Sequence, residues 1–160
     1  MKSIQTRATL LILLAGVASH ALADDGRWKV AKPKIVADTF ADTQWTQRDN
    51  LGDINWHDAK AHCANLDLDG GGWRLPTMSE LSQLYSGAGN DNVPCGAYQG
   101  TDFTCRAPRH FYLTGPGFWS GEQGKSSSEA WYFLLSNGTR LSEPVSFSYF
   151  KRALCVRRGS

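Results

Sequence analysis

Apolar residues recur with helical spacing in the second quarter of the chain. Trp56, Ala59, Cys63 and Leu66 stand at positions i, i+3, i+7 and i+10, so they share one face of a helix. Asn55 directly precedes this stripe, and its side chain can accept a hydrogen bond from the first helical turn. The pattern predicts a helix that begins at Asn55 and turns the Cys63 sulfur toward the core.

A second, shorter helix is predicted after a glycine-rich break at residues 70–72. Thr77 and Glu80 have the spacing of a capping box, in which the threonine caps the helix and the glutamate reaches back to it. The residues that follow supply an apolar side at Leu81 and Leu84. Nearby Arg74 is expected to join Glu80 in a buried or capping network rather than in a catalytic pair.

Runs of β-branched and aromatic residues predict strands on both sides of the helices. The expected strands cover residues 35–36, 43–47, 110–113, 118–120, 130–135, 139–141 and 152–157. Between the second helix and the later strands, residues 86–109 are rich in Gly, Asn, Asp and Pro and are predicted to form a long loop. This order predicts an α+β domain, with two helices on a small, mainly antiparallel sheet.

The N-terminal segment is typical of a secretory signal peptide. Lys2 and Arg7 precede an uncharged, largely apolar stretch over residues 8–18, and small residues at 21 and 23 mark a cleavage site after Ala23. The apolar stretch is shorter than the roughly 20 residues that cross a bilayer. We therefore expect a protein without a membrane span in its mature form, exported to the periplasm or secreted.

Composition indicates one globular domain and no nucleic-acid partner. The 160 residues are 41% hydrophobic and 20% charged, which argues against general disorder. Loss of Lys2 and Arg7 leaves 15 basic residues against 15 acidic ones, so the mature net charge is zero. We divide the chain into a signal peptide (1–23), a loose lead-in (24–34) and one domain (35–160).

Four cations are concentrated in the last ten residues, at Lys151, Arg152, Arg157 and Arg158. Two interpretations are open. The charges can protect a solvated edge strand from pairing with other chains. Alternatively, they can form a patch that binds an anionic ligand, which makes these four residues the candidate ligand-binding set.

The four cysteines form an even set in a chain predicted to be exported, which indicates two disulfides. Three pairings are possible. The order of elements favours Cys63–Cys155, which would pin the first helix to the last strand, with Cys95–Cys105 closing the long loop. No C-x2-C pair is present, and His57 and His62 are spaced wrongly for a helical zinc motif, so neither a metal site nor a catalytic thiol is expected.

Several blocks of sequence together resemble a known family. Residues 55–66 lead into Trp-Arg-Leu-Pro-Thr-x-x-Glu-Leu at 73–81, and further blocks follow at 118–122, 130–132, 137–138 and 155–157. They resemble the Lcl C-terminal domain family of bacterial exported proteins over roughly residues 35–159. The resemblance implies a C-type-lectin-like fold, similar to that of the formylglycine-generating enzymes, in which a disulfide from the first helix to the last strand is common.

The family also implies a role in binding. Its members occur as adhesin tips or small envelope proteins, and the founding type is associated with sulfated polysaccharides. This chain lacks the collagen-like stalk of the adhesin, so the ligand does not carry over by resemblance alone. The active cysteines of the formylglycine-generating enzymes have no counterpart at the spacing seen here.

Other candidate chemistry is weaker. Asp67 and Asp69 resemble the start of a calcium loop, but Gly71 and Met78 occupy positions that must supply oxygen ligands. Aromatic faces stack on sugars, yet most of the six tryptophans are expected in the core. We expect an exported, non-enzymatic binding module without a cofactor, whose partner is an anionic polysaccharide or an envelope or host protein. The alternatives are an envelope assembly protein without a small ligand and, less favoured, an enzyme.

Overall fold

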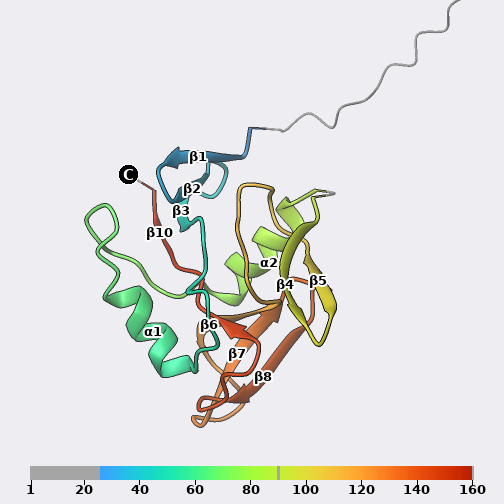
Figure 1. Cartoon of the computed structure of the whole chain (residues 1–160). Helices are drawn as coiled ribbons and strands as arrows, with labels where there is room; N and C mark the ends of the chain where they lie inside the picture. Colours follow the sequence, from blue (N-terminus) through green and yellow to red (C-terminus); the bar gives the residue numbers. More distant parts are fainter. Residues whose placement is uncertain (1–25, 90, 160) are drawn as a thin grey trace, which may run out of the picture.

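The computed structural model describes residues 26–89 and 91–159 (Figure 1). The signal peptide expected over residues 1–23 lies outside these described residues. The elements in chain order are β1 (Trp28–Lys32), β2 (Ile35–Asp38), β3 (Thr43–Thr46), α1 (Trp56–Ala64), α2 (Met78–Gly87), β4 (Val93–Tyr98), β5 (Thr101–Cys105), β6 (Gly117–Gln123), β7 (Glu129–Leu134), β8 (Arg140–Pro144), β9 (Lys151–Arg152) and β10 (Val156–Arg158).

The strands form two four-stranded sheets and one separate hairpin. One sheet has the order β1-β2-β3-β10 and is antiparallel, so it joins the first strands of the domain to the last. The other has the order β8-β7-β6-β9, in which only β6 and β9 run parallel. The hairpin β4–β5 lies at one side of the molecule in Figure 1. The α+β class with two helices and mainly antiparallel sheets is thus confirmed.

Both helices begin as the sequence predicts. The Asn55 side chain accepts a hydrogen bond from the Asp58 backbone and caps α1. Thr77 and Glu80 form the complete capping box of α2. Arg74 binds both oxygens of Glu80, at 2.7 and 2.8 Å, so this pair is a structural network at a helix terminus.

Two segments expected to be irregular are strands. Residues 28–32, placed in a loose lead-in, form β1 and pair with β2. Residues 86–109, expected to be a long loop, contain the hairpin β4–β5. Its turn at Gln99-Gly100 has positive φ at both residues, the backbone conformation that suits a tight hairpin. The glycines and the proline of this segment led to the prediction of a loop. In the structure they form a turn and an irregular strand that is nevertheless paired.

Two predicted strands are wrong in part. Residues 110–113 contribute only an isolated bridge between Tyr112 and Arg48. The expected strand 152–157 is split, because β9 pairs in one sheet and β10 in the other. Between them the backbone of Ala153 donates to the side chain of Asn50, and that of Cys155 donates to Thr46, so loop and strand side chains replace a ladder there.

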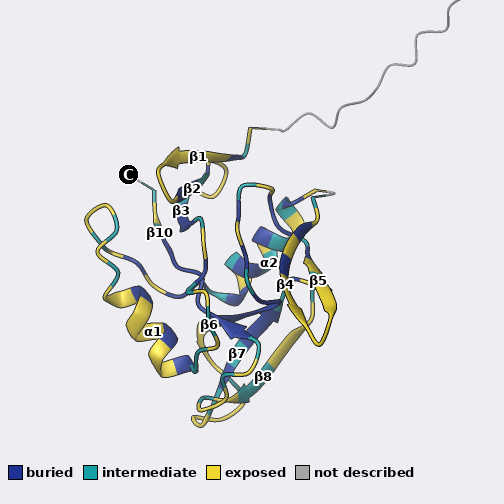
Figure 2. Ribbon diagram, in the orientation of Figure 1, coloured by how far each residue is buried: buried dark blue, intermediate teal, exposed yellow. Residues whose placement is uncertain are grey.

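The core has two parts. Figure 2 shows buried positions along β6 and β7 and on one side of each helix. One lies under α2 and the hairpin, and the other lies between α1 and the sheet of β6 and β7. Five tryptophans are buried, as expected for most of the six: Trp28, Trp45, Trp56, Trp73 and Trp119. The indoles of Trp56 and Trp119 each donate to a backbone carbonyl, which satisfies their polar atoms inside the core.

Both disulfides form with the predicted pairing. Cys63–Cys155 joins α1 to the segment just before β10 across 92 residues, and Cys95–Cys105 joins the two strands of the hairpin across 10 residues. All four cysteines are buried. The first bond therefore holds the helical layer to the end of the chain, and the second closes the hairpin at its base.

Candidate ligand-binding surface

The hairpin β4–β5 is fixed to the rest of the domain by a close backbone contact. Gly96 has a φ of +92°, and a Cβ placed there would lie 2.5 Å from the carbonyl oxygen of Thr114. A side chain at this position would push the two segments apart, so the contact requires glycine. Together with the disulfide at its base, this contact gives the hairpin a fixed position against residues 114–115.

Four aromatic side chains meet where this hairpin approaches the turn before β9, and we refer to them as the aromatic cluster. Tyr98 and Phe103 come from the hairpin, and Tyr149 and Phe150 come from the turn. The Tyr98 ring centroid lies 5.8 Å from that of Tyr149 and 5.0 Å from that of Phe150, with both pairs nearly perpendicular. Phe103 lies 5.5 Å from Phe150 and packs on the core, so the cluster is rooted in the domain.

The two tyrosines form the solvent-facing part of the aromatic cluster. Tyr98 is 40% exposed and Tyr149 is 44% exposed. A side-chain hydrogen bond with Tyr98, some burial and the nearby Asp53 carboxylate raise the pKa of Tyr149 to about 12. The Tyr149 hydroxyl is therefore neutral at physiological pH and remains a hydrogen-bonding group.

Three of the six non-glycine residues with positive φ among the described residues lie in loops around the aromatic cluster. Leu51, Gln99 and Phe150 have φ values of +66°, +47° and +56°, which residues other than glycine rarely adopt. Gln99 and Phe150 belong to the segments that carry the cluster. The loop of Leu51 is joined to the residue after Phe150, because the Ile54 backbone N–H donates to the Lys151 carbonyl. Such conformations persist where the surrounding structure enforces them, and they are frequent at binding sites.

Two of the predicted ligand-binding cations lie beneath this surface and face inward. Lys151 is buried, and its ammonium lies 3.0 Å from Glu143 and 4.0 Å from the centre of the Tyr132 ring. The ammonium also donates to the backbone carbonyl of Tyr149. Burial lowers the pKa of Lys151, and the hydrogen bond to Glu143 partly opposes this shift. Lys151 thus holds the turn that carries Tyr149.

Arg152 joins three segments beside the same turn. Its guanidinium pairs with Asp53, donates to the Thr114 hydroxyl at 2.9 Å and donates to the Thr114 carbonyl at 3.0 Å. Thr114 is the residue against which Gly96 of the hairpin packs. Arg152 therefore fixes the loop of Asp53, the Thr114 segment and β9 in one arrangement.

The other two predicted cations lie apart from this turn, on β10. Arg157 donates to Gln44, to the Asp69 carboxylate and to the Gly71 carbonyl, and its guanidinium lies 4.5 Å from the Trp73 ring centre. Arg158 is exposed. The four cations are therefore not gathered in one outward-facing patch, and a direct role of each in ligand binding stays a prediction.

The Asp69 carboxylate, which resembled part of a calcium loop, is bound by two cations. Lys32 and Arg157 both lie within hydrogen-bonding distance of it. Their hydrogen bonds, that from Lys32 first, lower the pKa of Asp69. Across residues 26–89 and 91–159, no group of three or more His, Cys, Asp or Glu side chains is arranged to hold a metal ion.

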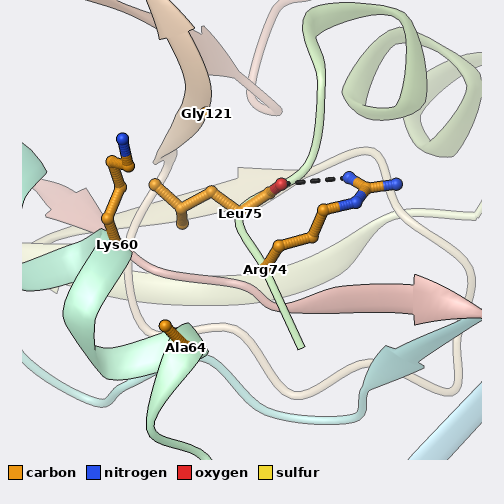
Figure 3. A pocket seen from close by; sticks show the side chains of 5 residues that line it. All are labelled: Lys60, Ala64, Arg74, Leu75 and Gly121. Carbon is orange, nitrogen blue, oxygen red and sulfur yellow. Dashed lines mark hydrogen bonds between the residues drawn. The ribbon is translucent and has the colours of Figure 1, made fainter. Parts of the chain in front are cut away.

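A small open pocket of about 240 Å³ lies between α1, the segment of residues 74–75 and the later part of β6 (Figure 3). Ala64, Leu75 and Gly121 line it together with the stems of Lys60 and Arg74. The Arg74 guanidinium is turned to Glu80 and to the Leu75 carbonyl, and the Lys60 ammonium lies 4.4 Å from the centre of the Trp56 ring. The pocket thus offers an apolar floor and cations that already have partners.

Sequence reasoning did not identify the aromatic cluster. The available signal was local: Tyr98 and Phe103 flank a two-residue turn signal inside a Gly- and Asp-rich segment, and Tyr149-Phe150 precede the cationic end of the chain. Only the fold places these two segments in contact. No helix among the described residues is long and apolar enough to cross a membrane.

Comparison with known proteins is consistent with this architecture. The model of the Lcl C-terminal domain matches residues 34–157, which is most of the chain and all of the described sheets except β1 and the last residue of β10. A search of curated proteins found no match. The chain therefore belongs to the Lcl C-terminal domain family.

Proposed function

We propose that this protein is an exported, non-enzymatic binding module that holds an extracellular ligand at the aromatic cluster. The observation that carries the proposal is the pair of half-exposed tyrosines, Tyr98 and Tyr149, on segments held in place by a disulfide, a close glycine contact and Arg152. Aromatic side chains that are held rigid supply contact area at little entropic cost on binding.

The fold that we propose for this module is the C-type-lectin-like one. Two features support it: the pairing of the N-terminal strands with β10, and the disulfide from α1 to the segment just before that strand. In such a domain the segment between the two halves carries the binding residues. The hairpin β4–β5 lies in the corresponding part of this chain, between α2 and β6.

Export and the absence of catalysis belong to the same proposal. Two disulfides fit an oxidising compartment such as the periplasm or the extracellular space. They also consume all four thiols of the chain, which removes the nucleophile that a formylglycine-generating type of chemistry would use. The carboxylates that pair with the two cations after Phe150, Glu143 and Asp53, are engaged by Lys151 and Arg152.

The second candidate function is envelope assembly, with a protein as the partner. The same observation favours it, because exposed tyrosines are enriched at protein interfaces. Both candidates use the aromatic cluster, and they differ in the chemistry of the partner. A glycan array and a solubilised envelope fraction, probed in parallel, separate them.

The test removes the two exposed rings from the mature chain. We expect Tyr98→Ala combined with Tyr149→Ala to weaken binding to the array or to the envelope fraction at least tenfold. Phe40→Ala is the matched control, because Phe40 is 69% exposed but lies in the turn between β2 and β3. Equal binding by wild type and the double tyrosine variant, with both folded by circular dichroism, would refute a binding role for the cluster.

A further inference from the structure

Resting on this proposed function, we infer that the ligand of the aromatic cluster is an uncharged glycan chain and not a sulfated or otherwise anionic one. The inference depends on one juxtaposition. Two half-exposed tyrosines lie beside Lys151 and Arg152, and carboxylates of the same chain already neutralise both cations.

The charges around the aromatic cluster do not suit an anion. Lys151 and Arg152, the cations closest to Tyr149 in the chain, are buried and paired with Glu143 and Asp53. To reach a sulfate, either cation would have to leave its carboxylate and a buried position, and the unpaired carboxylate would then cost free energy. The Asp53 carboxylate in turn is paired with Arg152, so neither member of this pair offers a free charge to a ligand.

The shape of the cluster suits the apolar faces of sugar rings. Tyr98 and Tyr149 stand at 89° to one another, so their exposed surfaces differ in orientation and meet at an angle. The C–H face of a pyranose can stack on an aromatic face without contributing charge. Two rings in different orientations favour a chain of linked sugars over a single flat ligand.

The edge of the cluster is polar and carries both donors and acceptors. The Gln99 amide donates to the Tyr98 hydroxyl at 2.9 Å, and Thr101, which pairs with Tyr98 across the hairpin, is exposed. Phenol, amide and hydroxyl groups can pair with sugar hydroxyls, which are donors and acceptors at once. A sulfate has no hydrogen to donate and can use only the donors of this edge.

The test compares neutral and anionic oligosaccharides of one length. Cellohexaose, maltohexaose and chitohexaose represent neutral chains, and a heparin hexasaccharide represents sulfated ones. Each is titrated into the mature protein by calorimetry at 50 mM and 500 mM NaCl. We expect at least one neutral hexasaccharide to bind with a Kd that changes less than twofold with salt, because no counterions are released.

Three variants assign that binding to the cluster. Tyr98→Ala with Tyr149→Ala should weaken it at least tenfold. Tyr98→Phe with Tyr149→Phe retains the rings and should weaken it less, which also guards against a fold defect in the alanine variant. Arg158→Gln, which changes the exposed cation of the C-terminal set, should leave the Kd within twofold of wild type.

Two results would overturn the inference. One is failure of all three neutral chains to bind. The other is tyrosine-dependent binding of the heparin hexasaccharide that weakens at least tenfold at high salt. If either occurs while the double alanine variant still loses binding to the array or the envelope fraction, the inference is wrong and the proposed function stands. If that variant loses nothing against any material, the proposed function fails as well.

Discussion

The two disulfides should stabilise the domain to different extents, because they close loops of very different length. Cys63–Cys155 spans 92 residues and Cys95–Cys105 spans 10. In the chain-entropy model, closing these loops in the unfolded state is worth about 4.6 and about 2.7 kcal/mol at 25 °C. Replacing the first pair by alanine should therefore cost about 2 kcal/mol more than replacing the second.

The two double variants are controls for each other. Each removes two sulfur atoms from positions that are at most 1% exposed, so the loss of packing is alike in both. Urea unfolding followed by tryptophan fluorescence gives the free energy of unfolding of Cys63→Ala/Cys155→Ala and of Cys95→Ala/Cys105→Ala. The difference between the variants then reports the difference in loop closure.

Cys95→Ala/Cys105→Ala should lower the free energy of unfolding less than Cys63→Ala/Cys155→Ala does. If it lowers it equally or more, loop closure does not explain the difference between the disulfides, and local docking of the hairpin dominates. Binding gives a second readout on variants that remain folded. Cys95→Ala/Cys105→Ala should weaken ligand binding, because it releases the base of the hairpin that carries Tyr98. Cys63→Ala/Cys155→Ala should change binding little.

Two further substitutions test particular contacts. Gly96→Ala should lower the free energy of unfolding by about 3 kcal/mol, because strain at positive φ adds to a backbone clash. Gly100→Ala, with open space around the new Cβ, should lower it by about 1 kcal/mol. Equal losses in urea unfolding would contradict the close contact. Lys32 and Arg157 lower the pKa of Asp69, so its stabilising effect is present above the unfolded value of 3.8 and is lost as the pH falls below it. Wild type should accordingly melt above Asp69→Asn at pH 7 and approach it at pH 3, and a constant gap in Tm would disprove this pairing.

The helices were predictable because their signals are local. The stripe beginning at Trp56, the Asn55 cap and the capping box of Thr77 and Glu80 each depend on residues within about three turns of one another. The disulfide pairing was predictable for a related reason. Once the order of helix and last strand is known, Cys63 and Cys155 are the pair that unites the domain, and the structure confirms it.

The hairpin and the aromatic cluster were not predictable in the same way. Strand β4 contains both Pro94 and Gly96, residue types that ordinarily weaken a strand. Here Gly96 is needed for the approach to Thr114, and Pro94 lies next to a register shift in the ladder. Contact between Tyr98 and Tyr149 depends on where a distant turn is held, which no spacing along the chain encodes.

The C-terminal cations show that charges adjacent in the sequence need not form one outward-facing patch. In the sequence Lys151, Arg152 and Arg157 resemble one basic cluster, but their carboxylate partners come from elsewhere in the chain. Glu143 lies eight residues before Lys151, whereas Asp53 and Asp69 lie 99 and 88 residues before the arginines they bind.

Because folding brings these partners together, most of the apparent positive charge is neutralised within the domain. The ion pairs of Lys151 and Arg152 have a structural role. Lys151 and Arg152 hold the turn of Tyr149 and the segment against which the hairpin packs. Two of the four residues first considered for binding an anion therefore hold the segments that carry Tyr98 and Tyr149. Under the proposed function, such a surface would select its ligand by stacking and hydroxyl pairing rather than by charge.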